Sequence, residues 1–440
     1  MFEFTAVWMF PALFFLVFMG FPVAFSMIGL SFAFGYWFFG DALGAQMFSR
    51  LHDVSTNYVL TALPLFVFMG AALERSGIAE RLFHAIQLWI GQLRGGLALT
   101  SIAMCAVFAA CSGVVGAVET IVGMMAIPAM MKQKYKKDLI SGTICAGGSL
   151  GTIIPPTVVV VVYASIVEQS IGDLFAGIVF PGLIMTVLFL GYILLRSYIF
   201  VDDAPIVELS TEERISISEK LRVSLVAIAP AVVLVTLVLG SILAGVASPT
   251  EAAGVGALGA VLLVIVYGKM SREVMKAIIG KAIQINAMVM FSVAGGIMVS
   301  SIFMVNGGNE LIELFLDETK PTKTQLIILM LLIFFVLGFI LDWVAIVLIC
   351  MPIFTPIIKV AGIDPVWFGI MVCIVIQTSY LTPPVAPSIF YLRAIAPPEI
   401  KYEHMFKGVV PFIICQLFVL LIVAFYPPTA LYLPNLLFGD

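Results

Sequence analysis

The sequence predicts an all-α polytopic membrane protein with about ten transmembrane helices, two re-entrant helical hairpins and inverted-topology repeats. Of its 440 residues, 62% are hydrophobic and only 11% are charged, and the mean hydropathy is +1.15. Apolar runs of about 20 residues, the length that crosses roughly 30 Å of hydrocarbon, recur from Phe4 to Tyr426. Strand-type alternation is absent from these runs, which favours helices over a barrel. The composition excludes a water-soluble globule.

Residues 1–57 are expected to form N-terminal scaffold helices. The segment Phe4–Phe39 has neither a basic leader nor a small-residue cleavage site, so it is interpreted as retained rather than as a signal peptide. Gly20-Phe-Pro22 interrupts this segment. It therefore forms either two short spans or one long broken helix.

A first repeat is predicted for residues 58–195. The apolar stretch 94–132 is too long for one crossing and fits a re-entrant hairpin whose tip lies near Gly113. The span 138–168 follows, with Gly151-Thr-Ile-Ile-Pro-Pro156 at its centre. Since prolines remove backbone donors, this span is predicted to be a broken helix.

Residues 196–281 are expected to be a cytoplasmic linker and scaffold helices, and residues 282–427 a second repeat. In that repeat, 323–359 is the predicted hairpin with Asp342 near its tip, and 364–393 is the second broken helix, interrupted at Thr382-Pro-Pro384. Residues 428–440 are left as a C-terminal tail.

The two predicted repeats share one offset. Pro128 and Pro356 are 228 positions apart, as are the pairs Pro155–Pro156 and Pro383–Pro384. Between equivalent positions the chain crosses the membrane an odd number of times, so the copies are inverted relative to each other. Inverted repeats with helices broken at mid-membrane are typical of secondary transporters, although a pore is a conceivable alternative.

Charge placement predicts the orientation. The basic loop that contains Lys132, Lys134, Lys136 and Lys137 is assigned to the cytoplasm by the positive-inside rule. Following the spans outward from this loop puts 18 of the 22 basic residues on the same side. The asymmetry supports the predicted order of spans.

The breaks and hairpin tips are predicted to meet at mid-membrane and to bind ions there. Carbonyl groups at the C-terminal ends of half-helices suit Na⁺, and the N-terminal ends suit an anionic carboxylate. The candidate Na⁺-binding residues are Ser112, Gly113, Gly148, Gly151, Pro155, Asp342, Thr378, Thr382 and Pro384. The candidate substrate-binding residues are Ser112, Gly116, Glu119, Pro156, Thr157 and Thr382.

Two acidic residues have alternative interpretations. Asp342 is a cation ligand or the cap of a hairpin turn, because a charged group at this depth needs a partner. Glu119 lines the substrate path or caps the local backbone.

An enzyme is not expected. Gly147-Gly-Ser-Leu-Gly151 matches GxSxG, which motivates an intramembrane serine hydrolase as a remote alternative, but no strand precedes it and no histidine lies at its depth to act as a base. The sequence contains no P-loop and no intramembrane His/Cys cluster for a metal. No cofactor is predicted beyond Na⁺ as the coupling ion.

Several motifs together resemble the large membrane subunit of the tripartite ATP-independent periplasmic (TRAP) transporters, within the ion-transporter superfamily. They are Gly20-Phe-Pro-Val-Ala24, Leu63-Pro-Leu-Phe66, Ser112-Gly-Val-Val-Gly116, Gly151–Pro156, Ser248-Pro-Thr-Glu-Ala-Ala253 and Pro383-Pro384. The resemblance implies Na⁺-driven import of a small organic acid by an elevator, in which the hairpins and broken helices slide as one block. It departs from the family pattern at the first tip, which has fewer hydroxyl groups and an added carboxylate, Glu119.

The resemblance also implies partners and a location. It implies a periplasmic substrate-binding protein, a small four-helix membrane subunit and the lipid of the bacterial inner membrane, with no nucleic acid. A stand-alone Na⁺/dicarboxylate or citrate-type carrier of the same superfamily is the alternative function.

Overall fold

The computed structural model describes residues 5–113, 115–206, 216–383 and 386–439. Within these ranges every regular element is a helix, and eight helical stretches are long and apolar enough to cross a membrane. Further apolar helices of 10–17 residues include Met9–Phe18, Val158–Val167 and Lys323–Leu337. The predicted all-α, multi-span class is confirmed.

The N-terminal segment forms separate helices. α1 (Met9–Phe18) ends before Gly20, whose φ of +90° reverses the chain, and α2 (Val23–Phe39) begins directly after Pro22. α3 (Leu43–Thr56) follows. Of the two arrangements left open above, the structure has two helices rather than one broken helix.

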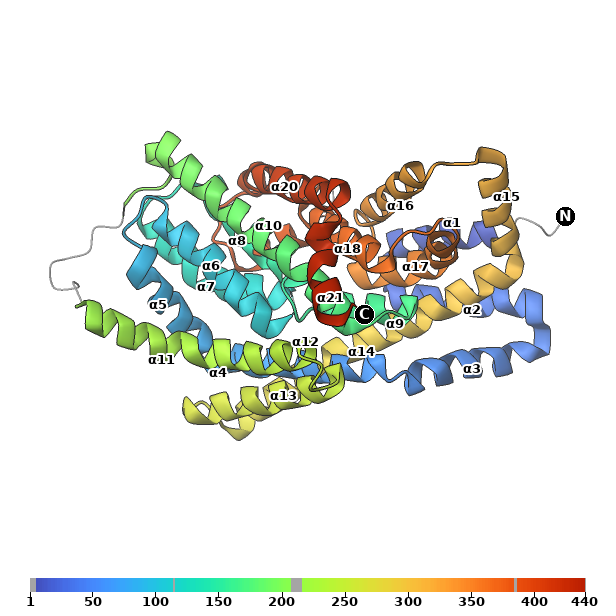
Figure 1. The fold of residues 1–440 in the computed structure, drawn as a ribbon, viewed down its shortest axis with the longest axis horizontal. Helices are drawn as coiled ribbons and strands as arrows, with labels where there is room; N and C mark the ends of the chain where they lie inside the picture. Colours follow the sequence, from blue (N-terminus) through green and yellow to red (C-terminus); the bar gives the residue numbers. More distant parts are fainter. Residues whose placement is uncertain (1–4, 114, 207–215, 384–385, 440) are drawn as a thin grey trace.

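A layer of long helices lies along one side of the molecule (Figure 1). α4 (Ala62–Ser76) packs on α13 (Pro249–Val266) and on α14 (Arg272–Phe303), and α14 also packs on α2. An ion pair between Lys281 and Glu74 joins α14 to α4. The layer is completed by α11 (Ile217–Val235), the π-helical turn Thr236–Gly240 and α12 (Ser241–Leu243).

Two amphipathic helices lead out of this layer. α5 (Ile78–Ile90) begins after Gly77 and packs on α6 and α11. Its repeat counterpart, α15 (Asn309–Thr319), follows α14 after a kink at Asn306 and Gly307.

Both predicted hairpin segments contain two helices joined by a short tip. α6 (Gly96–Ser112) and α7 (Val115–Lys132) lie within 94–132. α16 (Lys323–Leu337) and α17 (Trp343–Val360) lie within 323–359. The first tip includes Gly113, and the second consists of residues 338–342.

Each predicted broken helix consists of two helices separated by an irregular segment. α8 (Lys137–Ser149) continues as the 3-10 turn Leu150–Thr152, and after Pro155 and Pro156 the chain resumes as α9 (Val158–Val167). In the second copy α18 (Pro365–Leu381) and α19 (Pro387–Ile395) flank the interruption.

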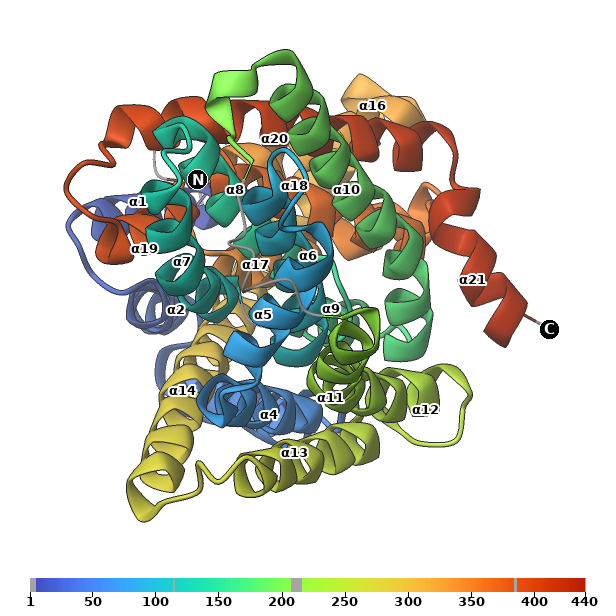
Figure 2. The ribbon, with the colours of Figure 1, turned by 90° about the vertical axis from the view of Figure 1, so that its left-hand side faces the viewer.

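The remaining long helices hold the broken helices from outside. α10 (Ile171–Ile199) and α20 (Tyr402–Phe425) pack on each other and on α18. The expected C-terminal tail is instead mostly α21 (Pro428–Phe438), which packs beside α10 (Figure 2). Gly177 permits this contact, since a Cβ there would lie 2.7 Å from the carbonyl oxygen of Ala430.

A close backbone crossing joins α8 to α20. A Cβ at Gly142 would collide with the carbonyl group of Gly408, and a Cβ at Gly408 would collide with that of Asp138. Small residues let membrane helices approach in this way. The crossing fixes the broken helix of the first repeat against the last span of the second.

We predict that Gly142→Ala lowers stability, because the added methyl group meets backbone that cannot rotate away, at a cost of about 1–3 kcal/mol. The measurement is the thermal midpoint of the purified protein. Gly280→Ala in α14 is the matched control, since a Cβ there meets nothing within 4 Å. Equal midpoints for both variants would contradict this packing.

Candidate cation and substrate site

The first hairpin tip lies against the first helix break. Gly113 ends α6 with φ +62°, and its N–H donates to the carbonyl oxygen of Ala109 at 3.0 Å. A Cβ at Gly113 would lie 2.6 Å from the carbonyl oxygen of Pro156. The predicted residues Gly113 and Pro156 are therefore brought together, and only glycine fits between them.

The residues of the first break are buried except for the half-buried Ile154, and the Pro155–Pro156 peptide bond is cis. Gly148 lies in the last turn of α8 and Gly151 in the 3-10 turn that continues it. Thr157 starts α9 as its N-cap, and its Oγ1 accepts the N–H of Val160 at 3.2 Å. The C-terminal ends of α6 and α8 thus converge here, and α9 begins on the other side of the break.

The second tip lies against the last turn of α18, directly before the second break. A Cβ at Gly338, which directly follows α16, would collide with the side chain of Ser379 near the end of α18. The hydroxyl groups of Thr378 and Thr382 donate to the carbonyl oxygens of Ile374 (2.8 Å) and Thr378 (2.7 Å). Because their protons are committed to the backbone, their oxygen lone pairs stay available to a cation.

Asp342 caps α17. Its Oδ2 accepts the N–H of Val344 at 3.2 Å, and its carbonyl oxygen accepts the N–H of Ile346. This is the capped turn that the sequence offered as the alternative interpretation. The cap uses part of the carboxylate, so cation binding by Asp342 stays a prediction.

Two predicted residues are described only in part or not at all. Pro384 lies outside the described residues, and only the backbone of Ser112, the last residue of α6, belongs to them.

Glu119 joins the first hairpin to the second repeat. It is fully buried, and its Oε2 accepts the hydroxyl of Ser388 in α19 at 2.7 Å. A Cβ at Gly148 would lie 2.6 Å from its Cβ, so the side chain packs directly on the first break. Oε1 has no hydrogen-bond partner in the described chain. Glu119 is therefore no helix cap, because it bonds a side chain of another element.

The sequence missed the partners of Glu119 and Gly116. Besides Ser388, these include Tyr391, whose ring would lie 3.1 Å from a Cβ at Gly116. Both residues lie in α19, one or two turns after the second break. The only sequence signal for these contacts was a serine and a tyrosine shortly after the Pro383–Pro384 pair.

The half-helices pair according to which of their ends, C-terminal or N-terminal, lies at a tip or a break. In each repeat the hairpin helix that ends at the tip packs on the helix that ends at the break, namely α6 on α8 and α16 on α18. The helices that begin there pack across the repeats, α7 on α19 and α9 on α17. C-terminal ends carry partial negative charge and N-terminal ends partial positive charge. The arrangement provides two cation-favouring places and anion-favouring helix starts beside them.

Oxygen ligands other than carboxylates would have to complete any cation site. No group of three or more His, Cys, Asp or Glu side chains within the described ranges is placed to hold a metal ion. Backbone carbonyl groups and hydroxyl groups are common ligands of hard cations, and the breaks supply both.

The GxSxG serine lacks the surroundings of a nucleophile. Ser149 Oγ donates to the carbonyl oxygen of Ala146 at 2.7 Å and accepts the side-chain amides of Gln377 at 3.1 Å and Gln416 at 3.2 Å. Neither partner is a base, so this geometry gives no support to a hydrolase.

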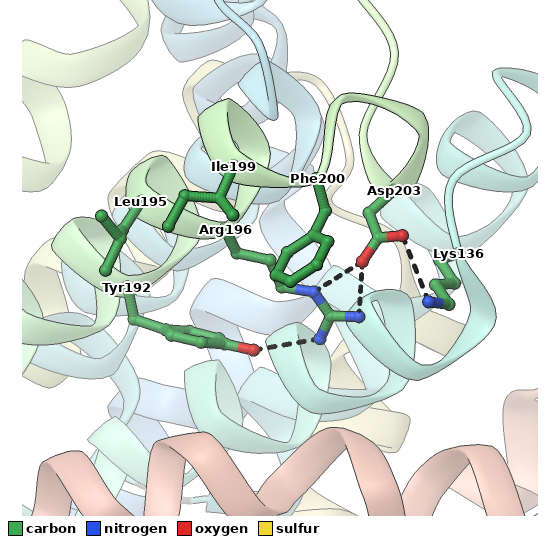
Figure 3. Close-up of a pocket in the computed structure, with 7 residues that line it drawn as sticks. All are labelled: Lys136, Tyr192, Leu195, Arg196, Ile199, Phe200 and Asp203. Atoms are coloured by element: carbon green, nitrogen blue, oxygen red, sulfur yellow. Dashed lines mark hydrogen bonds and ion pairs between the residues drawn. The ribbon is translucent and has the colours of Figure 1, made fainter.

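A separate polar cluster lies at the other end of α8 (Figure 3). It lines a cavity of about 270 Å³. Arg196 donates to Asp203 at 2.9 Å, to Tyr192 at 3.0 Å and to Asp138 at 2.8 Å, and Lys136 pairs with Asp203 at 3.2 Å. Since every charge here has a partner, the cluster fastens α8 to the end of α10 and is distinct from the breaks.

The hairpins, broken helices and apolar spans together define a multi-pass membrane carrier fold. Its overall course is similar to that of a solved structure, the YdaH transporter of Alcanivorax borkumensis, with a TM-score of 0.60 and 14% identity over 89% of this chain and 90% of that chain. This likeness shows the fold alone.

The family follows from sequence. Residues 10–429 match the family described as "Tripartite ATP-independent periplasmic transporter, DctM component", and the chain belongs to this family of large TRAP membrane subunits. The C4-dicarboxylate TRAP transporter large permease protein DctM of Pseudomonas aeruginosa is 31% identical over 93% of both chains. The sialic acid TRAP transporter large permease protein SiaM of Vibrio cholerae is 28% identical, and the ectoine/5-hydroxyectoine protein UehC of Ruegeria pomeroyi 29%, each over 96% of this chain and 97% of the relative.

We predict that Gly113→Ala lowers transport at least tenfold. The variant combines left-handed backbone strain of about 1–2 kcal/mol with a collision against Pro156, and the two together displace the tip from the break. Uptake in proteoliposomes is the measurement. Gly362→Ala is the matched control because Gly362 has φ +60° with nothing within 4 Å of its Cβ. Equal uptake by the two variants would refute a functional contact at this tip.

Proposed function

We propose that this chain is the large permease subunit of a binding-protein-dependent transporter that imports a small organic acid across the bacterial inner membrane, driven by Na⁺ through an elevator movement. The observation that carries the proposal is the pairing of each hairpin tip with one helix break, Gly113 with Pro156 and Gly338 with Ser379. Each hairpin and its broken helix could move together as one block only if the tip and the break stay in contact.

Na⁺ is placed at the two meeting points of C-terminal helix ends. One cation would lie between Ser112-Gly113 and the segment Gly148–Pro155, and the other between Asp342 and Thr378–Thr382. The organic acid would bind between the tips, where α7, α9, α17 and α19 begin and Thr157 and Glu119 are near. Two Na⁺ per monoanion would move one net charge, worth about 2.3 kcal/mol per 100 mV.

Names of relatives support an acid as cargo and an assembly of subunits. Two of the relatives reported above are named for C4-dicarboxylates and sialic acid, and all three are named as TRAP large permeases. We extend this to a periplasmic binding protein that delivers the cargo and a small four-helix membrane subunit that braces the layer of α4, α11, α13 and α14.

We predict that Asp342→Asn raises the Na⁺ concentration for half-maximal uptake at least tenfold and leaves the thermal midpoint unchanged. Asparagine caps a helix as well as aspartate does, so the variant removes the charge and keeps the cap. Na⁺ titration of uptake in proteoliposomes is the measurement. Asp364→Asn is the control, because Asp364 caps α18 through the N–H of Trp367 at 2.8 Å and is exposed.

If Asp342→Asn retains the Na⁺ activation of the unmodified protein, Asp342 is a cap only and the second cation site is misplaced.

We predict that uptake requires all three components. Proteoliposomes that hold the chain with its small subunit are expected to accumulate organic acid only when the binding protein and an inward Na⁺ gradient are both supplied. Equal uptake by the chain alone would favour a stand-alone carrier over a subunit.

A further inference from the structure

A buried hydrogen-bond node joins the two repeats at equivalent positions. Ser149 and Gln377 are 228 positions apart, which is the offset of the repeats, and Gln377 Nε2 donates to Ser149 Oγ at 3.1 Å. Gln416 in α20 donates to the same oxygen at 3.2 Å. All three side chains are fully buried. The pseudo-symmetry of the repeats therefore places the node between their equivalent helices.

The donors and acceptors of this node can be arranged in only one way. Ser149 has a single hydroxyl proton, which it donates to the carbonyl oxygen of Ala146, so it accepts from both amides through its two lone pairs. Both glutamines must present Nε2, and their Oε1 atoms are left without a hydrogen-bond partner in the described chain. A buried polar group without a partner is costly. One hydroxyl thus binds two amides whose oxygen atoms are unsatisfied in the described chain.

The node also touches both candidate cation sites. Ser149 lies between Gly148 and Gly151, whose backbone belongs to the first site, and it ends α8. Gln377 directly precedes Thr378, which belongs to the second site, near the end of α18. α18 contacts both α8 and the 3-10 turn that continues it. The hydrogen bond from Gln377 to Ser149 is therefore a direct polar link between the two sites.

We propose that the Ser149–Gln377 hydrogen bond couples the two cation sites, so that filling one raises the affinity of the other, with Gln416 anchoring the node to α20. A cation at the first site attracts the carbonyl groups at the end of α8 and sets the position of Ser149. The amide of Gln377 follows the hydroxyl, and the last turn of α18, with its carbonyl groups and threonines, follows the amide. Such a coupling is reciprocal by thermodynamic necessity. The inference rests on the proposed Na⁺ coupling.

The test compares the Na⁺ binding curves of Gln377→Leu and Gln416→Leu, followed by tryptophan emission of the purified protein, since Trp343 adjoins Asp342. A tenfold coupling gives a Hill coefficient of about 1.5 for two sites, which we expect for the unmodified protein. Gln377→Leu should lower the coefficient to about 1. Gln416→Leu removes an equal amide from the same node but keeps the link, so its coefficient should stay near 1.5.

Serine variants provide a second, independent comparison. Ser149→Ala should also lower the coefficient to about 1, whereas Ser141→Ala should not. Ser141 is a buried serine of the same helix whose hydroxyl donates only to the carbonyl oxygen of Lys137, at 2.7 Å. If Ser149→Ala fails to fold, Gln377→Leu decides, because there Ser149 keeps its bond from Gln416.

The outcomes separate the two proposals. A cooperative unmodified protein whose Gln377→Leu variant stays cooperative overturns the coupling and leaves Na⁺-driven transport intact. A coefficient of 1 in the unmodified protein, with Na⁺-dependent binding, also overturns the coupling alone. Absence of any Na⁺-dependent binding overturns both.

Discussion

The structure depends on satisfying interrupted backbone in the middle of a membrane. Each helix break frees N–H and C=O groups where no lipid can bond them, at several kcal/mol per group. The chain places the tip of a preceding hairpin against each break: Gly113 lies on Pro156 inside the first break, and Gly338 lies on Ser379 in the last turn of α18 before the second. The need for this close cover explains why both tips have glycine, and why hairpin and broken helix form one unit in each repeat.

The packing of tips against breaks also groups the helix ends by the sign of their partial charge. Helices that end at mid-depth pair within a repeat, whereas helices that begin there pair across the repeats. Negative and positive partial charges are thereby separated into neighbouring places, and the described residues of the tips and breaks include no arginine or lysine. Threonine hydroxyl groups reinforce the negative places because their protons are bonded to the backbone. These two local arrangements support the proposed transport of an anion together with its driving cations.

Sequence alone predicted the parts of this fold that are encoded locally. The hairpins, the breaks and the repeat offset follow from segment length and from the positions of Gly113, Pro155 and Pro383, which act on the backbone where they stand. The helix α21 was missed because it packs on α10, a contact that the local sequence does not reveal. Ser388 and Gln416 were missed because a buried hydrogen bond between residues 269 or 267 positions apart leaves no periodic trace.

The roles and contacts of the two acidic residues, Asp342 and Glu119, were predicted only in part from the sequence. The sequence placed Asp342 at the second tip, and it offered both a cap and a cation ligand; the cap is observed. For Glu119 the sequence predicted a place near the first tip but not the partner Ser388, since that contact depends on how α7 meets α19. Polar side chains at mid-membrane are costly, so their positions in the sequence indicate the functional region. Their partners are identified only by the tertiary structure.

The central claim is that cations occupy the two places where tip meets break. The most direct measurement is a high-resolution map of the assembled transporter in lipid, recorded once with Na⁺ and once with a large organic cation in its place. We predict spherical density in the Na⁺ map between Gly113 and Pro155 and between Asp342 and Thr378, and no such density in the other map. Identical maps, or Na⁺-dependent density elsewhere only, would contradict it.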